Sequence, residues 1–494
     1  MPDSLLCCAA LLLFTVLLHR RSADMSFIGR PCFADAAACA VAGWLYALML
    51  CISGRPLLAL VFCILLLTGL YCVNAAKIRA LRGEPLVFAD VALAWQVVRF
   101  PALYLPFLPC KALASGVLVG IAGLTLLWLM PEPVAFSAWW LLLLCWPLFL
   151  LLLCSPYGQA VAHYLQTRWP LTFKAQDDAR RYGPLGAALL HVCWHLGLRE
   201  HTSTNASVSV HANTALPRST PLPNIFLVQA ESFCDPRIFS PHIPRDFLPH
   251  YDAACAQGIS GSIAVAAFGA YTMRTEFAVL TGQSAASMGT DAFHPYWSAA
   301  RPCTWSLARH LRNRGYRTVC LHPFYREFFF RHKAIPDLGF DAFISLENFP
   351  HRATFGPYVS DASVARSMLE LLQDDRPVFC FAITMESHGP WRAGRLHGQG
   401  LHLPGLNAEA GRYLRHLRNA DAMIGCLCAG LREQNRPGIL GWYGDHLPNL
   451  PHLIPAGETA VPFFVWKTSR KYQEYCEKIQ PETLGEKLLT IHSH

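Results

Sequence analysis

The stretch that decides the fold is Asn224–Pro236, with the sequence NIFLVQAESFCDP. Ile225–Val228 is an uninterrupted apolar run, the pattern of a strand that is buried on both faces of a parallel sheet. Glu231 comes where such a strand ends. Because ligands in open α/β sheets bind beyond the carboxyl ends of the strands, Glu231 is a candidate site residue.

The composition indicates that part of the chain lies within a membrane. The 494 residues are 53% hydrophobic and only 15% charged, whereas soluble domains carry about a quarter charged residues. The net charge of +8 favours anionic partners, and with a membrane part present we expect lipid and no nucleic acid. The 19 cysteines contain no CxxC pair and no zinc-ligand spacing, so no disulfide is assigned.

Residues 1–155 are predicted to form a transmembrane bundle of about five helices. A spanning helix needs about 20 apolar residues, and the last three of five apolar runs approach this length. The first run lacks a preceding charged segment and a cleavage site, so we expect an uncleaved helix rather than a signal peptide. The runs are Leu5–Leu18, Ala36–Ile52, Pro56–Val73, Ala112–Met130 and Val134–Cys154.

The remaining chain divides into a connecting segment, residues 156–223, and an α/β domain, residues 224–494. Pro156–Glu200 mixes apolar and basic residues, as amphipathic helices on a membrane surface do. His201–Pro223 is rich in Ser, Thr, Asn and Pro, which is typical of a linker. From Asn224 onward, strand-like and helix-like segments alternate.

Further strand-like runs end at residues with site chemistry. They are followed by His322, by a segment containing His388, by Asp445-His446 and by Lys467. Carboxylates and imidazoles are the ligands that a divalent metal or a phosphate site needs, and three of these strand ends supply them. We expect those three ends to meet Glu231 at one sheet edge. The runs are Arg317–Leu321, Val378–Thr384, Gly438–Tyr443 and Val461–Trp466.

Thr272 is the candidate nucleophile. Gly269–Phe277 has the pattern of a Gly-bearing turn entering a helix, with Thr272 near the helix start and Glu276 one turn later. In one interpretation Thr272 is an N-cap, worth about 1 kcal/mol. In the other, exposed amides and the positive helix end stabilise its alkoxide and an incoming phosphate, and a metal lowers its pKa. Thr275, almost one turn deeper, is the alternative nucleophile.

Five motifs, in order along most of the chain, resemble the lipoteichoic acid synthase/phosphoglycerol transferase family. This family is a membrane-anchored branch of the alkaline phosphatase-like (sulfatase) superfamily. A further segment, Asn74–Lys77 followed by Glu84-Pro85-Leu86 and Asp90, resembles the family's loop after the third membrane helix. The five motifs are QAESF (229–233), TMRTEFAVLTG (272–282), residues 322–331, SHGP (387–390) and YGDHLP (443–448).

The resemblance implies an alkaline phosphatase-like domain with a mainly parallel central sheet and a defined set of site residues. One divalent ion, usually manganese with magnesium or zinc as alternatives, would be bound by Glu231, Thr272, Asp445 and His446. The phosphate pocket would contain His322, Phe329, Arg331 and His388. Phe329 replaces the usual Trp, which leaves the acceptor or headgroup open. Arg331 is suited to a bidentate grip on phosphate.

The activity that the resemblance implies is transfer of a glycerophosphate headgroup from phosphatidylglycerol to a glycan or polymer, through a phospho-threonine intermediate. The alternatives are a phosphoethanolamine transferase, a periplasmic phosphodiesterase or sulfatase-type hydrolase, and an inactive membrane-bound scaffold. Cys234-Asp235-Pro236-Arg237 approaches the CxPxR motif of sulfatases, but its arginine comes one residue too early. It also follows the metal-ligand strand, where a nucleophile does not belong.

The loop charges and the family resemblance predict opposite orientations in the membrane. Basic residues follow the first, third and fifth apolar runs, and the positive-inside rule would place all three regions in the cytoplasm. The resemblance instead implies a multi-pass protein of the bacterial inner membrane whose catalytic domain faces the periplasm or outside. We adopt that orientation, with the hypothesis that the basic third loop holds anionic headgroups.

Overall fold

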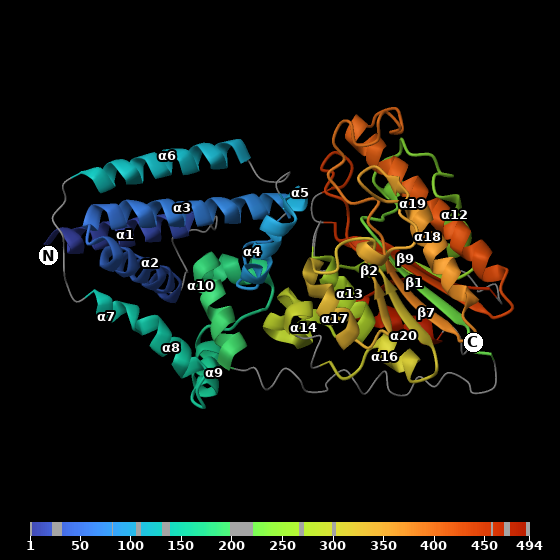
Figure 1. The fold of residues 1–494 in the computed structure, drawn as a ribbon, viewed down its shortest axis with the longest axis horizontal. Helices are drawn as coiled ribbons and strands as arrows, with labels where there is room; N and C mark the ends of the chain where they lie inside the picture. Colours follow the sequence, from blue (N-terminus) through green and yellow to red (C-terminus); the bar gives the residue numbers. More distant parts are fainter. Residues whose placement is uncertain are drawn as a thin grey trace. The chain divides into compact units, whose positions relative to one another are not determined.

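The computed structural model divides into two compact units, Met1–Thr202 and Ser203–His494, each of which is described by itself (Figure 1). The predicted linker lies almost entirely outside the described residues. The structure describes residues 2–21, 32–81, 83–104, 110–130, 139–197, 221–265, 271–298, 303–455, 458–468 and 475–490.

The N-terminal unit is helical. Three of its helices, α1, α2 and α3, are long and apolar enough to cross a membrane, and they pack around a core that includes Tyr46 and Cys63. The described helices are α1 (Pro2–Arg21), α2 (Cys32–Ser53), α3 (Pro56–Ala80), α4 (Asp90–Arg99), α5 (Pro101–Tyr104), α6 (Cys110–Leu129), α7 (Trp140–Leu143), α8 (Cys145–Leu153), α9 (Gly158–Arg168) and α10 (Ala175–Gly197).

The last predicted span, Val134–Cys154, corresponds in its described part to the helical stretch Trp140–Leu153. After a short break this stretch is followed by α9, and the two are bent by 99°. Pro156 lies in the break, and proline disfavours helical geometry in the residue before it. Counted as one span, this pair brings the number of candidate spans among the described helices to four. These helices make the chain a membrane-anchored protein.

The segment after α3 is held by its own polar residues. Asn74 Oδ1 accepts a hydrogen bond from Leu86 N at 2.8 Å, and Lys77 Nζ contacts Asp90 Oδ2 at 2.7 Å and Pro85 O at 2.8 Å. The Lys77 ammonium is therefore engaged inside the loop. The motif that resembles the family's loop closes this segment back onto α3.

The C-terminal unit is built on an eight-stranded sheet with the order β10-β2-β9-β8-β1-β7-β3-β4. Only β9 runs against its neighbours, so the predicted mainly parallel sheet is confirmed for the described residues. The strands are β1 (Asn224–Ala230), β2 (Ile259–Ala264), β3 (Arg317–Leu321), β4 (Ala342–Ile344), β7 (Val378–Ile383), β8 (Gly438–Gly444), β9 (Ala460–Lys467) and β10 (Tyr475–Ile479), and β5 (Thr354–Phe355) pairs separately with β6 (Tyr358–Val359).

Helices cover both faces of this sheet (Figure 1). One group packs α12, α18 and α19 together against β7, β8 and β9, while α13 packs against α16 and α20 on the other side. The helices are α12 (Pro249–Cys255), α13 (Thr272–Thr281), α14 (Ala285–Met288), α15 (Pro295–Ser298), α16 (Leu307–Arg312), α17 (Arg331–Asp337), α18 (Asp361–Glu370), α19 (Ala408–Arg432) and α20 (Pro481–Thr490), with short 3₁₀ turns at 236–238, 289–293, 328–330, 346–348 and 371–373.

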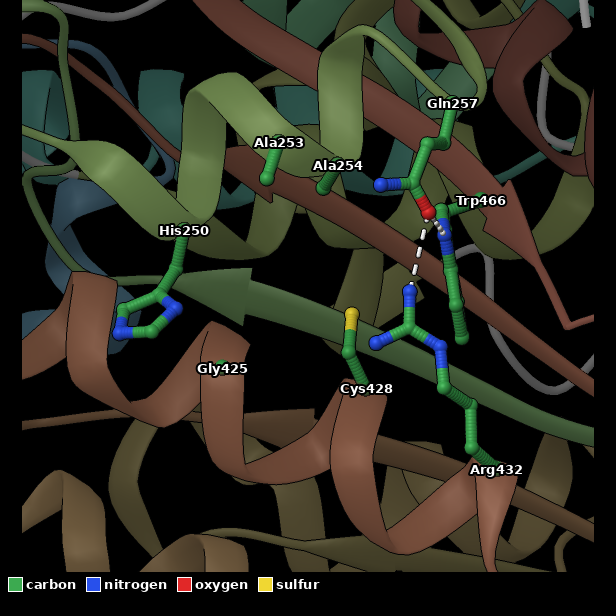
Figure 2. Close-up of a pocket in the computed structure, with 8 residues that line it drawn as sticks. All are labelled: His250, Ala253, Ala254, Gln257, Gly425, Cys428, Arg432 and Trp466. Atoms are coloured by element: carbon green, nitrogen blue, oxygen red, sulfur yellow. Dashed lines mark hydrogen bonds between the residues drawn. The ribbon is translucent and has the colours of Figure 1, made fainter. Parts of the chain in front are cut away.

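A pocket of about 240 Å³ lies between α12, α19 and β9 (Figure 2). Gln257 Oε1 accepts hydrogen bonds from Arg432 Nη2 at 2.9 Å and from Trp466 Nε1 at 3.2 Å, and the Arg432 guanidinium stacks on the Trp466 ring. None of the predicted site residues lines this pocket. Its lining residues are His250, Ala253, Ala254, Gln257, Gly425, Cys428, Arg432 and Trp466.

Candidate active site

Strand register brings the three predicted metal ligands together. In the parallel pair of β1 and β8, Ala230 lies opposite Gly444, so the next residues, Glu231 and Asp445, leave the sheet side by side. His446 follows directly. The candidate ligand atoms of Glu231, Asp445 and His446 all lie within 4.8 Å of one another, and all three residues are buried. Residues that are more than two hundred positions apart in the sequence therefore form one cluster at this edge of the sheet.

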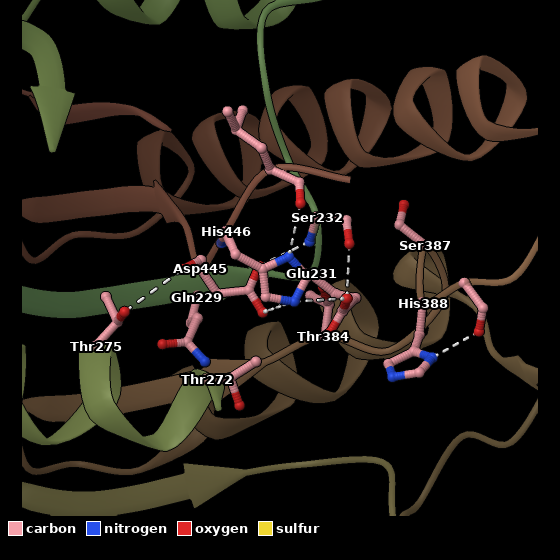
Figure 3. A network of polar contacts seen from close by, with 12 residues as sticks. Gln229, Glu231, Ser232, Thr272, Thr275, Thr384, Ser387, His388, Asp445 and His446 are labelled. Atoms are coloured by element: carbon pink, nitrogen blue, oxygen red, sulfur yellow. Dashed lines mark hydrogen bonds and ion pairs between the residues drawn. The ribbon is translucent and has the colours of Figure 1, made fainter. Parts of the chain in front are cut away.

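Hydrogen bonds fix the orientation of this cluster (Figure 3). Asp445 Oδ1 accepts from the backbone amides of Ser232 at 2.7 Å and His446 at 2.8 Å, and the Ser232 hydroxyl donates to Glu231 Oε1 at 2.8 Å. His446 Nδ1 lies 3.2 Å from Leu447 O, while its Nε2 lies 3.5 Å from Glu231 Oε1 and 3.6 Å from Asp445 Oδ2. Metal-bound histidines are typically oriented by such a carbonyl contact on the other nitrogen.

The electrostatics of the cluster suit a divalent cation. Burial and the neighbouring Glu231 raise the pKa of Asp445 well above its ordinary value. Burial disfavours ionisation of Glu231 as well, but His388 and His446 nevertheless hold its pKa below the ordinary value. Burial lowers the pKa of His446, which favours the neutral imidazole. Two carboxylates and a neutral imidazole are a donor set that fits Mn²⁺, Mg²⁺ or Zn²⁺.

Thr272 is the first residue of α13 and does not cap it. The N-cap position belongs to Tyr271, which has a left-handed backbone with φ 59°, so the N-cap interpretation of Thr272 is wrong. The Thr272 hydroxyl instead donates to Glu276 Oε1 at 2.9 Å. The alternative, Thr275, is buried, and its hydroxyl lies 3.4 Å from Asp445 O. Thr272 is half-buried and is therefore the more accessible of the two residues, both of which are drawn in Figure 3. Residues 269 and 270 of the expected turn lie outside the described residues.

Arg331 is placed beside Thr272 by an ion pair that the sequence did not predict. Its side chain is 1% exposed, and it contacts Glu276 through Nε, at 3.0 Å from Oε2, and through Nη2, which meets Oε1. Nη2 also donates to Thr272 Oγ1 at 3.1 Å. Burial opposes the positive charge, but Glu276 nevertheless raises the pKa of Arg331. The sequence pattern indicated only a possible capping role for Glu276.

His322 and Phe329 contact Arg331 from other sides. His322 Nε2 lies 3.2 Å from Arg331 Nη1, and its Nδ1 lies 3.3 Å from Ile383 O. Burial and the Arg331 charge lower the pKa of His322 well below its ordinary value, so its imidazole is neutral. The Phe329 ring centroid lies 5.3 Å from the guanidinium carbon of Arg331. The structure thus brings both residues into contact with Arg331.

His388 completes the set from the loop after β7. It is half-buried, and its Nδ1 lies 2.8 Å from Gly389 O (Figure 3). It lies close enough to Glu231 and His446 to affect the pKa of both. In contrast, Lys467 ends the antiparallel strand β9, which places it at the opposite edge of the sheet.

Backbone strain concentrates at these residues. Six non-glycine residues in the described part of the chain have positive φ, and four of them are predicted site residues or adjoin one. Ser232 follows Glu231, Tyr271 precedes Thr272, and Phe329 and Phe330 precede Arg331. Such conformations cost of order 1–3 kcal/mol each and cluster at functional sites. This feature supports a functional role for the same edge of the sheet.

The chain belongs to the sulfatase family, because the Sulfatase family model matches residues 223–488, more than half of its length. The predicted membership of the alkaline phosphatase-like superfamily is therefore confirmed. The chain is 30% identical over 438 residues to the capsular polysaccharide biosynthesis protein RkpI of Rhizobium meliloti, covering 84% of this chain and 78% of that protein.

Two further proteins are similar over shorter regions. A putative cyclic beta-1,2-glucan modification protein of Rhizobium meliloti is 32% identical over 235 residues, covering 46% of this chain and 36% of the relative. Among solved structures, the phosphoglycerol transferase GacH of Streptococcus pyogenes matches with a TM-score of 0.47 and 21% identity, covering 54% of this chain and 74% of that one.

Proposed function

We propose that the protein is a membrane-anchored phosphoglycerol transferase that moves a glycerophosphate headgroup from phosphatidylglycerol to a glycan or polymer acceptor. One observation carries the proposal. The Thr272 hydroxyl lies within hydrogen-bonding distance of Arg331 at the same sheet edge as the Glu231, Asp445 and His446 cluster. A hydroxyl nucleophile, a guanidinium and a metal-ligand cluster are the components of phosphoryl transfer through a covalent intermediate.

In the first half-reaction, Thr272 Oγ1 attacks the phosphorus of the lipid phosphodiester, and the bond from phosphorus to the diacylglycerol oxygen breaks. Diacylglycerol leaves with a proton, and a glycerophospho-threonine remains. In the second half-reaction, the acceptor hydroxyl attacks this phosphorus, loses its proton and releases Thr272. A divalent cation held by Glu231, Asp445 and His446 would supply Lewis-acid stabilisation of the threonine alkoxide and the phosphoryl oxygens.

The two candidate proton donors differ in their surroundings. His322 is buried and neutral, and its Nε2 faces the Arg331 guanidinium. His388 is half-buried in a loop beside Glu231. We therefore assign to His388 the proton transfer to the leaving oxygen and from the acceptor, and to His322 the placement of Arg331. Arg331 stabilises the charge on the phosphoryl oxygens.

The membrane helices support a lipid donor, and the relatives support a glycan acceptor. One relative is named for capsular polysaccharide biosynthesis and another for modification of a cyclic glucan. We extend that chemistry to this chain. A phosphoethanolamine transferase would use the same residues with a different donor, so lipid analysis must separate the two activities.

The test is headgroup transfer by the detergent-solubilised full-length protein with Mn²⁺ and phosphatidylglycerol that carries a fluorescent acyl chain. Thr272→Ala should abolish release of fluorescent diacylglycerol. Thr281→Ala is the matched control, because Thr281 ends the same helix and donates to Phe277 O at 2.7 Å, away from the site. Full turnover by Thr272→Ala, or activity only with fluorescent phosphatidylethanolamine, would overturn the proposal.

The proposed location is the bacterial inner membrane, with residues 224–494 on the periplasmic or outer side. This orientation gives the site access to lipid headgroups of the outer leaflet and to envelope glycans. In this orientation a C-terminal alkaline phosphatase fusion should be active. A C-terminal green fluorescent protein fusion would be exported in an unfolded form and should not fluoresce. A reporter that is active only in the cytoplasm would contradict this orientation.

A further inference from the structure

Glu276 is a buried carboxylate to which the mechanism above gives no role. It lies on α13, one turn after Thr272, and is 0% exposed. Besides Thr272 and Arg331, it accepts hydrogen bonds from Gln229 Nε2 at 2.9 Å and Tyr296 Oη at 3.0 Å. Its two oxygens therefore receive donors from four different segments of the domain. Such a densely bonded carboxylate has little freedom to rotate or to leave its position.

Glu276 occupies one edge of the Arg331 guanidinium and leaves another edge for other contacts. The edge formed by Nε and Nη2 is occupied by the two oxygens of Glu276. On the remaining side, Nη2 reaches Thr272 Oγ1 at 3.1 Å and Nη1 reaches His322 Nε2 at 3.2 Å. The edge formed by Nη1 and Nη2 is thus directed between the nucleophile and His322. A planar guanidinium can bind a phosphate with two parallel hydrogen bonds only if such an edge is correctly turned.

We propose that Glu276 is the positioning residue that holds the Nη1 and Nη2 edge of Arg331 toward the phosphoryl group carried by Thr272. This inference rests on the proposed function, since it assumes that phosphate is transferred at Thr272. Glu276 acts through Arg331 and through the orientation of the Thr272 hydroxyl, and it does not itself contact the substrate.

The residues behind Glu276 support this role. Gln229, which donates to Glu276, accepts from Tyr443 Oη at 2.7 Å, and so connects the carboxylate to both central strands β1 and β8. Tyr296 holds the other oxygen from α15. Because a well-packed apolar pair can match or exceed a buried ion pair in stability, stability alone does not account for an Arg–Glu pair at this position. The Arg331–Glu276 pair instead directs the Nη1 and Nη2 edge of the guanidinium between Thr272 and His322, which would serve catalysis.

The test compares Glu276→Gln with Asp421→Asn in the full-length protein. Asp421 is the matched control because it is also a buried carboxylate, accepting from the amides of His250 and Tyr251, and no predicted site residue contacts it. With Mn²⁺ and fluorescent phosphatidylglycerol, Glu276→Gln should lower kcat by on the order of 100-fold, the cost of a misplaced catalytic group. Bound manganese, measured by mass spectrometry, should equal that of the wild type.

Two further measurements separate positioning from folding. Affinity for glycerol phosphate, measured by calorimetry with Mn²⁺, should fall about tenfold in Glu276→Gln, as expected when a bidentate contact is lost, and should stay at the wild-type value in Asp421→Asn. The double variant Glu276→Gln/Arg331→Ala should be no slower than Arg331→Ala alone, since residues that act as a unit are not additive. If Glu276→Gln does not fold, Tyr296→Phe, which removes one donor to Glu276, should lower kcat several-fold.

The outcomes distinguish this inference from the proposed function. Wild-type kcat and phosphate affinity in Glu276→Gln, or additive losses in the double variant, would overturn the positioning role while the loss in Thr272→Ala still upholds the transferase. Absence of glycerol phosphate binding to the wild type, or turnover by Thr272→Ala, would overturn the proposed function and with it the role of Glu276.

Discussion

Metal removal should destabilise the protein by an amount that depends on pH. Glu231 and Asp445 place carboxylate oxygens within 4.8 Å of each other in a buried site. Two full charges at that separation repel by about 3 kcal/mol at an effective dielectric constant of about 20. The metal-free protein relieves this repulsion by keeping a proton on Asp445, whose pKa is raised well above its ordinary value of 3.8. A bound cation must displace that proton.

The sign of the pH dependence follows from this proton. Well below pH 3.8, both the folded and the unfolded metal-free chain carry it, and little metal binds. As the pH rises toward the folded pKa, the unfolded chain loses the proton first, so the metal-free protein loses stability by up to about 1.4 kcal/mol per pH unit. In the metal-bound protein Asp445 stays ionised, so its stability does not fall with pH in this way. The stabilisation by metal should therefore grow with pH.

The assay is differential scanning fluorimetry of the solubilised full-length protein with either Mn²⁺ or EDTA, between about pH 5 and about pH 8. Manganese at about 100 times its Kd adds about 2.7 kcal/mol, or roughly 5 °C in Tm for a domain of this size. Equal Tm values in both solutions, or a difference independent of pH, would refute the reasoning. Asp445→Asn should remove the pH dependence.

Three further outcomes are expected. Arg331→Lys should lower kcat by about 100-fold or more in the lipid assay, because an ammonium cannot contact Glu276, Thr272 and the phosphate at once; near-wild-type kcat would contradict this. Gly444→Ala should lower the free energy of unfolding by about 1–3 kcal/mol and weaken Mn²⁺ binding in calorimetry, since its Cβ would lie 2.2 Å from Phe233 O; unchanged Mn²⁺ affinity would argue against that displacement. Lys77→Met should lower the Tm by removing the contacts to Asp90 and Pro85, with Lys77→Arg as the milder control; an unchanged Tm would show that this loop is held by other contacts.

The buried strands and the residues at their ends could be predicted from the sequence because both signals are local. The apolar run before Glu231 became β1, and the ends of β3, β7 and β8 carry His322, the His388 loop and Asp445 to the same edge. These predictions depended on short apolar runs, such as the four residues Ile225–Val228, which are typical of strands that are covered on both faces.

The rest depended on pairing between distant segments. β2 has the sequence ISGSIA, without a continuous apolar run, and exists because β9 and β10 flank it. The antiparallel direction of β9 has no local signal, so the sequence did not show on which edge of the sheet Lys467 lies. Glu276 was seen only beside Thr272, because the sequence does not show that an arginine 55 residues later returns to the same helix. Orientation of polar side chains was thus the least predictable property of the site.

The position of β1 in the sheet has a consequence for how the chain is made. Its two neighbours are β7 and β8, and the second is complete only at Gly444, more than two hundred residues after β1 ends. At synthesis rates of about 5–20 residues per second, β1 in the nascent chain keeps at least one edge unpaired for roughly 10–40 s. During that interval Asp445 and His446 do not yet exist, so the proposed metal site is incomplete. A chain truncated before β8 would stay inactive and expose an edge prone to aggregation.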